Sequence, residues 1–179
     1  MYKEVIADIN YVDILLDFKL DIVFNSAEVL SMEKNEMEKL VNYCEEEIRE
    51  NIENYRIVYE ENKIVAAFHV DDYSDGKMVD FVYVMPDCRR LGIGTYIINE
   101  IVNNNYKALY AWVYKENEIA IHMMESNAFV VEEETEYKYL MKNLNEKKEN
   151  IDIKLQLFKN DVDELAKKYG ITYKLDCSI

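Results

Sequence analysis

The stretch FVYVMPDCRRLGIGT, residues 81–95, decides how this chain folds. It begins as an apolar strand, Phe81 to Val84, and after a short turn it opens a helix that we expect to end near Asn104. Gly92 and Gly94 lie where the helix begins, and the first N–H groups of a helix have no partners within it. Glycine lets a ligand approach those groups closely, and the positive end of the helix dipole favours an anion. The stretch therefore predicts a turn that binds phosphate.

Two familiar phosphate loops do not fit this stretch. A dinucleotide fingerprint needs a third glycine, and Ile97 stands in its place. A Walker loop needs Lys and then Ser or Thr after its last glycine, whereas Thr95 and Tyr96 follow here. What remains is the pattern Arg-x-x-Gly-x-Gly between a strand and a helix.

This pattern resembles the acyl-CoA pyrophosphate loop of the GNAT superfamily of N-acyltransferases. A second stretch supports the resemblance, because residues 117–129 (NEIAIHMMESNAF) are similar to the family's Asn-x-x-Ala-x-x-x-Tyr-Glu-x-x-Gly-Phe. Two positions depart from it: Met124 stands where the family has tyrosine, and Ala128 stands where it has glycine. The resemblance covers roughly residues 1–144.

Periodicity along the chain predicts the same fold. We expect strands at residues 2–6, 55–60, 63–70, 78–84, 108–114, 129–131 and 136–144, and helices at residues 10–24, 33–50, 89–104 and from Asn117 onward. Antiparallel hairpins and one strand–helix–strand crossover indicate an α/β (α+β) fold with a mixed, mostly antiparallel central sheet and helices on both faces. This is also the order of elements in the GNAT fold.

Residues 145–179 extend past the usual end of that fold. A charged linker, residues 145–150, precedes an alternating strand pattern, a short helix that Gly170 ends, and a last strand at residues 171–175. We expect one acyltransferase domain over residues 1–144. The small β-α-β extension, residues 145–179, should pack on that domain or on a second subunit, and a homodimer is the expected assembly.

Composition excludes several classes of protein. The net charge of −15 argues against nucleic acid as a partner. Three cysteines, too few for a disulfide framework, indicate a reducing cytoplasm. Charged residues within the N-terminal apolar stretch argue against a signal peptide, and the chain has no apolar run long enough for a membrane span. The two histidines lie far apart in the sequence, so no metal site is expected.

The resemblance implies which residues bind acetyl-CoA. Backbone amides of the loop would hold the pyrophosphate, and these belong to Arg90, Leu91, Gly92, Ile93, Gly94 and Thr95. Val84 and Met85 would hydrogen-bond the pantetheine arm, and Arg89 would add charge near the phosphates together with Arg90. Asn117 either contacts the pantetheine arm or caps a helix, because asparagine is a favoured N-cap.

A general base is needed because an amine with a pKa near ~10 is mostly protonated at pH 7. Asp80 interrupts an apolar strand, and by alternation it would share a face with Val82 and Val84. The resemblance places the base on this strand. Asp71 and Asp72 are the second choice for the base. The alternative is that Asp80 is a paired or solvated acid at the exposed end of the strand.

The remaining candidates concern the other reactive groups. In the resemblance a tyrosine protonates the departing thiolate, and Met124 cannot do so. Three tyrosines on the predicted strands could replace it: Tyr83, Tyr110 and Tyr114. Cys88 is not expected to act as a nucleophile, because the family transfers the acyl group directly. We expect His69 to be a hydrogen-bonded structural histidine and His122 to face solvent.

The sequence thus predicts an acetyl-CoA-dependent N-acetyltransferase that acts on a primary amine of a small molecule. Two alternatives stay open at this point. One is a protein or peptide N-acetyltransferase, and the other is a non-catalytic acyl-CoA-binding regulatory module.

Overall fold

A computed structural model describes residues 2–25, 32–104 and 106–144. Seven strands form one sheet in the order β1-β2-β3-β4-β5-β7-β6. The strands are β1 (Tyr2–Ile6), β2 (Tyr55–Glu60), β3 (Lys63–Tyr73), β4 (Gly76–Val84), β5 (Ala108–Tyr114), β6 (Val130–Glu134) and β7 (Lys138–Leu144). The described helices are α1 (Val12–Phe24), α3 (Lys34–Glu50), α4 (Ile93–Asn103) and α5 (Glu118–Ser126), with short 3-10 turns η1 (Ile9–Tyr11), η2 (Ile52–Asn54) and η3 (Pro86–Cys88). The expected order of elements is confirmed.

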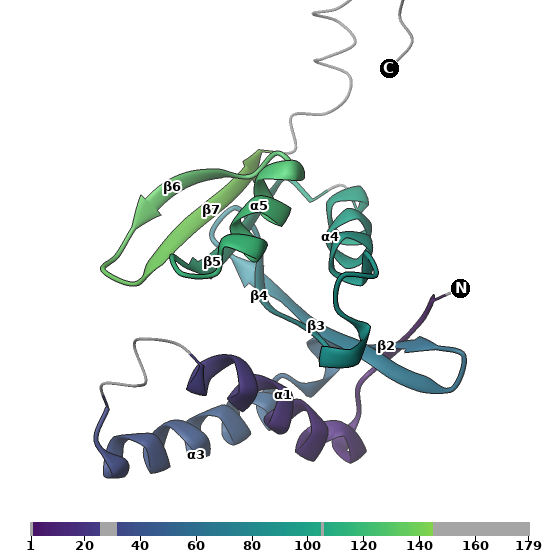
Figure 1. The fold of residues 1–179 in the computed structure, drawn as a ribbon, viewed down its shortest axis with the longest axis vertical. Coiled ribbons are helices and arrows are strands. Elements are labelled where there is room, and N and C mark those ends of the chain that lie inside the picture. The colour runs from purple at the N-terminus through teal and green to yellow at the C-terminus, as the bar shows by residue number, and fades with distance from the viewer. Residues whose placement is uncertain (1, 26–31, 105, 145–179) are drawn as a thin grey trace, which may run out of the picture. The chain divides into compact units, whose positions relative to one another are not determined.

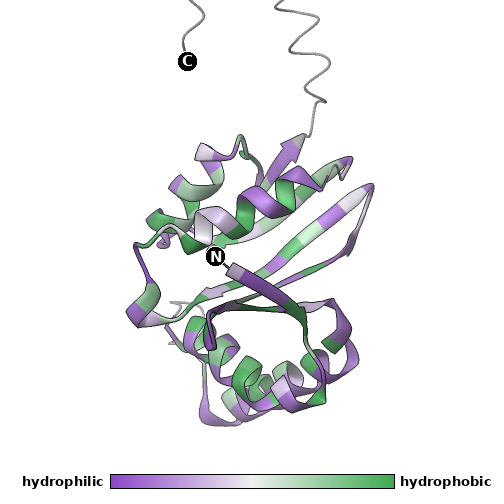
Figure 2. Ribbon diagram, turned by 90° about the vertical axis from the view of Figure 1, so that its right-hand side faces the viewer, coloured by the Kyte–Doolittle hydropathy of each residue, from purple (hydrophilic) through white to green (hydrophobic). Residues whose placement is uncertain are grey.

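Helices cover both faces of this sheet. Figure 1 shows α1 and α3 on one side and α4 and α5 on the other, and Figure 2 shows the same two helix layers after a quarter turn. Each layer has its own hydrophobic core. On the α4 side the core includes Ile97, Ile98 and Leu109, and on the α1 side it includes Leu15 and Ile48. All five side chains are fully buried, because the apolar stripe of each helix faces the sheet.

The pairing of β4 with β5 is the feature that opens the sheet. This is the one parallel pair among the described strands, and its register extends only over Lys77↔Leu109 and Met78↔Tyr110. All other neighbouring strands are antiparallel and pair over most of their length. From Val79 onward, β4 therefore leaves β5, and the carboxyl ends of these two strands stand apart.

A β-bulge lies in β4 where this separation starts. The register of β3 with β4 passes from His69↔Phe81 to Val70↔Val79, so Asp80 has no partner on β3. A bulge leaves one extra residue unpaired and bends its strand. The bulge thus interrupts the regular alternation of side chains at Asp80.

The predicted boundaries need small corrections. The strand expected to end at Val70 continues to Tyr73, and the helix expected from Arg89 begins at Ile93, after the separate turn η3. The strand expected at residues 129–131 covers Val130–Glu134. Glu61 takes the left-handed conformation, with φ 56°, that glycine usually supplies in such a hairpin. The predicted extension, residues 145–179, lies outside the described residues, and its boundary stays a prediction.

Candidate active site

The N-terminus of α4 has the geometry that the glycine pattern predicts. Gly92 is the N-cap and adopts the left-handed conformation, with φ 81°. The first bond of the helix runs from the Tyr96 amide to the Gly92 carbonyl, 2.9 Å apart. The amides of Ile93, Gly94 and Thr95 therefore precede the helical ladder. The first turn contains no acidic residue, and Gly92 has no side chain to cap it, so the positive end of the helix is free to receive an anion.

The two glycines serve different needs. A Cβ on Gly92 would meet nothing within 4 Å, so its requirement is conformational. A Cβ on Gly94 would lie 3.1 Å from the Met123 sulfur of α5. Gly94 thus permits close packing of α4 on α5, while Gly92 permits the turn into the helix.

The two arginines of the loop differ in their contacts. The Arg89 side chain lies against α1 and β4: its Nε donates to the Val84 carbonyl at 3.0 Å, and its Nη2 lies 3.4 Å from Asp21 Oδ2. Its guanidinium also lies 5.5 Å from the centre of the Tyr83 ring. Arg90 is exposed and has a φ of 64°. Both arginines are exposed, but the contacts of Arg89 brace the end of β4 in this structure.

The residues expected to bind the pantetheine arm lie at the carboxyl end of β4. The Met85 amide donates to the Val65 carbonyl of β3 at 2.9 Å, so it is already committed within the sheet. Asn117 caps α5, because its Oδ1 accepts from the Ala120 amide at 3.0 Å. The expectation that Asn117 caps a helix is confirmed, and its contact with acetyl-CoA stays a prediction.

Met124 and Ala128, the two departures from the family pattern, have clear structural positions. Met124 is buried in the core beneath α4 and α5, with 4% of its surface exposed. Its carbonyl accepts from the Phe129 amide, and the Glu125 carbonyl accepts from the Ala128 amide. This is a Schellman motif, which needs a left-handed residue at Ala128. Ala128 has a φ of 61°, which explains why glycine is the usual residue there.

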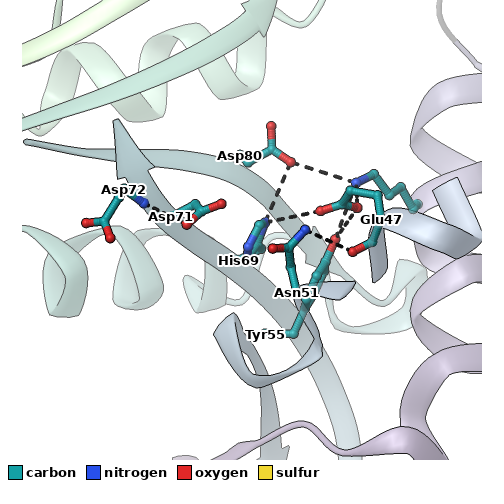
Figure 3. Close-up of polar contacts among 8 residues, drawn as sticks. Glu47, Asn51, Tyr55, His69, Asp71, Asp72 and Asp80 are labelled. Atoms are coloured by element: carbon teal, nitrogen blue, oxygen red, sulfur yellow. Dashed lines mark hydrogen bonds and ion pairs between the residues drawn. The ribbon is translucent and has the colours of Figure 1, made fainter. Parts of the chain in front are cut away.

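A polar cluster lies on the side of the sheet that α1 and α3 cover, at the bulge of β4 (Figure 3). Lys19 of α1 contacts Glu47 of α3, and the Tyr55 hydroxyl of β2 donates to Glu47 Oε2 at 2.9 Å. His69 of β3 places Nδ1 3.9 Å from Glu47 Oε1 and 3.7 Å from Asp80 Oδ2. Five elements thus bring together side chains that are distant in the sequence.

Asp80 faces this cluster, which corrects the expected geometry. Its carboxylate lies 3.8 Å from Lys19 Nζ on the α1 side. Val82 and Val84 instead pack against the core on the α4 side. Simple alternation failed because the bulge turns Asp80 and Phe81 toward the same face.

The Asp80 carboxyl is electrostatically prepared to stay ionised. Its contact with His69 and the charge of Lys19 lower its pKa, although partial burial opposes that shift. Its side chain is 46% exposed, whereas those of Lys19 and Glu47 are 14% and 16% exposed. Asp80 is thus the accessible carboxylate of the cluster. Burial, with Glu47 as the second cause, raises the pKa of Tyr55, so its hydroxyl remains a donor.

His69 differs from its expected role as a hydrogen-bonded structural histidine. It is 2% exposed, and neither ring nitrogen has a hydrogen-bond partner among the described residues. Its ring stacks on Tyr55, with centroids 4.3 Å apart and planes 4° apart. The sequence offered one signal for it, a histidine within an otherwise apolar strand. Lys19, Glu47 and Tyr55 were missed because nothing in their local sequence distinguishes them from surface or core residues.

The other candidates lie away from this cluster. Lys77 pairs with Asp72 at 2.6 Å, and Asp71 accepts from the Asp72 amide, at the end of β3 where β4 and β5 still pair. Figure 3 shows both residues beside the cluster, with no dashed contact to Glu47, His69 or Asp80. The Tyr83 hydroxyl donates to Asp21 and the Tyr110 hydroxyl to Asp75. Tyr114 is the last residue of β5, and Lys138 Nζ lies 4.5 Å from the centre of its ring.

Two further features have reactive side chains: Cys88, and the group formed by Glu47, His69 and Asp80. Cys88 is buried in η3 as a free thiol, which agrees with a structural role. Glu47, His69 and Asp80 each offer one donor atom, and these atoms lie within 4.8 Å of one another. The Lys19 ammonium lies beside both carboxylates, so the chain itself supplies a cation there.

Comparison with known proteins agrees with this geometry. The family model described as the acetyltransferase (GNAT) family matches residues 23–129, more than half of the chain. The chain belongs to the GNAT family. It is therefore an acetyltransferase that uses acetyl-CoA as its co-substrate. A search of curated proteins finds no matching sequence.

Solved GNAT structures share the fold at low sequence identity. The PaiA N-acetyltransferase of Thermoplasma acidophilum, solved with coenzyme A, is 11% identical with a TM-score of 0.66, over 80% of this chain and 99% of that one. A GNAT acetyltransferase of Bacillus cereus is 17% identical with a TM-score of 0.59, over 80% and 97%. YncA of Salmonella typhimurium, a putative acetyltransferase solved with acetyl-CoA, is 12% identical with a TM-score of 0.58, over 82% of this chain and 95% of that one.

None of the described helices is long and apolar enough to cross a membrane.

Proposed function

We propose that this GNAT protein transfers an acetyl group directly from acetyl-CoA to a primary amine of a small molecule, with Asp80 as the general base. The observation that carries the proposal is the position of Asp80. It is a half-exposed carboxylate on the bulge where β4 leaves β5. The same strand leads through η3 to the amides at the N-terminus of α4.

The α4 N-terminus would hold the pyrophosphate of acetyl-CoA. The amides of Ile93, Gly94 and Thr95 precede the helical ladder there, and hydrogen bonds to charged groups contribute about 1.5–3 kcal/mol each. Exposed Arg90 would add positive charge beside the phosphates. The facing edges of β4 and β5, unpaired beyond Met78 and Tyr110, would accept the pantetheine arm between them.

Asp80 would remove a proton from the acceptor. The ammonium gives its proton to the carboxylate, the free amine attacks the thioester carbonyl, and the C–S bond breaks to release the CoA thiolate. Because the pKa of Asp80 is lowered, the carboxylate is ready to accept that proton at neutral pH. A free thiol has a pKa near ~8.5, so the thiolate is a tolerable leaving group even without a tyrosine at Met124.

The charge of the cluster favours a cationic acceptor. Glu47 and Asp80 contribute two negative charges, and Lys19 contributes one positive charge beside them. An acceptor ammonium would balance the remaining negative charge.

Both cysteines that the structure describes, Cys44 and Cys88, are buried free thiols, which agrees with an enzyme of the cytoplasm.

The test is to incubate the protein with acetyl-CoA and a panel of small amines and peptides, while free thiol is measured. Asp80→Asn is the matched control because it keeps the size of the side chain and removes the base. We expect thiol release with small amines that depends on Asp80. Thiol release with peptides alone would indicate protein acetylation instead. If neither the amines nor the peptides support thiol release, both acetylation proposals are refuted.

A further inference from the structure

His69 is the buried polar side chain that the reaction described so far leaves unused. It is 2% exposed, and both of its ring nitrogens lack a hydrogen-bond partner among the described residues. A buried polar atom without a partner costs about 1–3 kcal/mol, so each such atom in a folded protein requires an explanation.

The contacts of the ring determine which nitrogen carries a hydrogen. His69 Nδ1 lies between two carboxylate oxygens, 3.7 Å from Asp80 Oδ2 and 3.9 Å from Glu47 Oε1. Ionised carboxylates only accept hydrogen bonds. The arrangement therefore requires an N–H group at Nδ1. Both distances exceed that of a full hydrogen bond, so a small movement toward either oxygen would complete one.

The ring is held firmly in this orientation. It stacks almost parallel on the Tyr55 ring, and its backbone pairs with Tyr55 on one side and Phe81 on the other. Tyr55 is itself fully buried and donates its hydroxyl to Glu47. The direction of the Nδ1–H bond is thus set by the sheet and by the stacked ring.

The two carboxylates differ in their freedom. Glu47 is occupied by Lys19 and Tyr55 and is mostly buried. Asp80 is 46% exposed, and no described residue lies within hydrogen-bond distance of its carboxylate. His69 Nδ1 therefore lies between the Glu47 carboxylate, which Lys19 and Tyr55 hold in place, and the accessible Asp80 carboxylate that we assign as the base.

We propose that His69 is the positioning residue of the general base: its Nδ1–H group orients the Asp80 carboxylate toward the acceptor. Glu47, Tyr55 and Lys19 form the anchor that fixes His69. This inference rests on the proposed function, in which Asp80 removes the proton of the amine. His69 itself is too buried to touch the acceptor, so it acts through Asp80.

The electrostatics of the cluster agree with this role. The contact with His69 is the largest cause that lowers the pKa of Asp80, burial acts against it, and Lys19 adds to it. The groups that face His69 and Asp80 are Lys19 of α1, Cys44 and Glu47 of α3, Tyr55 of β2 and Lys138 of β7, whose charge also lowers the pKa of Asp80. Without His69 the largest cause that lowers the pKa of Asp80 is lost, so that pKa would rise.

The experiment compares three variants with the wild type. His69→Phe keeps a stacked aromatic ring and removes the donor, and His69→Asn restores an N–H group near the position of Nδ1. His122→Phe is the matched control, because His122 is the other histidine of the chain and is exposed on α5. Each protein is labelled with ¹³C at its aspartate carboxyl groups. The Asp80 resonance is identified by its loss in Asp80→Asn, and its titration is followed by NMR.

We expect the Asp80 titration to move to higher pH in His69→Phe, to return part of the way in His69→Asn, and to stay unchanged in His122→Phe. With a responsive amine from the panel, the acid limb of kcat/KM should move in the same direction. The activity at the optimum should fall by up to about 10²-fold, as expected for a misplaced reactive group.

Three results would overturn the inference. The first is an Asp80 titration that is the same in His69→Phe and wild type. The second is an acid limb that stays in place while the titration moves, which would make His69 purely structural. The third is an equal shift in His122→Phe. Failure of the proposed function looks different: the wild type would release no thiol with any acceptor, whatever the titration shows. If His69→Phe does not fold, His69→Leu, which also removes the donor, takes its place in the same comparison.

Discussion

The loop at the start of α4 and the polar cluster at the bulge of β4 differ in how the sequence forms them. The loop lies within one continuous stretch, Arg89 to Thr95. The cluster draws one side chain from each of five elements: Lys19, Glu47, Tyr55, His69 and Asp80. The first is a motif of backbone amides and the second is an arrangement of side chains. A cofactor that is common to a family can be bound by a motif, whereas the base must be placed by the whole fold.

The largest expected effect comes from the loop. Gly92→Val should abolish binding of CoA, because a branched side chain is strained at a φ of 81° and would occupy space near the phosphate. Losing two charge-assisted hydrogen bonds of about 1.5–3 kcal/mol each would raise Kd by about 10²–10⁴-fold. Titration of CoA by calorimetry measures this.

Gly92→Asn is the matched control for that variant. Asparagine tolerates the left-handed conformation, and nothing lies within 4 Å of the added Cβ, so the protein should stay folded. We expect weaker CoA binding in this folded variant as well. Unchanged affinity in both variants would remove the loop from the cofactor site.

The second effect separates the cluster from the loop. Asp80→Asn should lower kcat by about 10²–10⁴-fold and leave the affinity for CoA nearly unchanged. Raising the pH should partly restore the rate, because more of the amine is then free without help from a base. The rate is measured as thiol release across pH. An equal loss at every pH would contradict the role of Asp80 as base.

The third effect concerns the missing acid. Met124→Tyr should increase the rate of thiol release, by up to about 10²-fold, and leave CoA binding intact. Met124 is buried, so the larger side chain should lower stability by about 1–3 kcal/mol. Met124→Phe has similar bulk and no hydroxyl. A gain that appears equally in Met124→Phe would show that packing, and not proton donation, causes it.

A smaller effect should appear in stability alone. Tyr55→Phe removes a hydroxyl that donates to Glu47 and lies 3.3 Å from Lys19 Nζ. Because Glu47 and the hydroxyl are mostly buried, we expect the free energy of unfolding to fall by about 1–3 kcal/mol. Denaturant unfolding measures this change. The affinity for CoA should stay the same, because the loop does not depend on the cluster.

The smallest effect tests a departure that the sequence itself revealed. Ala128 occupies a left-handed position with a φ of 61°, so Ala128→Gly should relieve strain and raise the free energy of unfolding by about 1 kcal/mol. Thermal unfolding would detect the gain. A loss of stability would mean that the flexibility of glycine in the unfolded chain outweighs the strain that it relieves.

The order of elements and the loop could be predicted because their signals are local. Periodicity places strands and helices, and Gly92 with Gly94 marks the start of α4 in the sequence itself. The cluster could not be predicted, because it depends on how distant elements meet. Asp80 does lie within a strand, as expected, but the bulge reversed its expected face. His69 was expected to be a hydrogen-bonded structural histidine, and its unpartnered ring nitrogens became visible only with Glu47 and Asp80 placed around it.

The short register between β4 and β5 has a mechanical consequence. The sheet consists of two sub-sheets, β1 to β4 and β5 to β7, whose ladders meet at Lys77↔Leu109 and Met78↔Tyr110. A molecule that hydrogen-bonds to the facing edges of β4 and β5 would link the two sub-sheets and restrain their relative movement. Amide hydrogen exchange should then slow on both sides when CoA binds, and the two sub-sheets should open together as one cooperative unit.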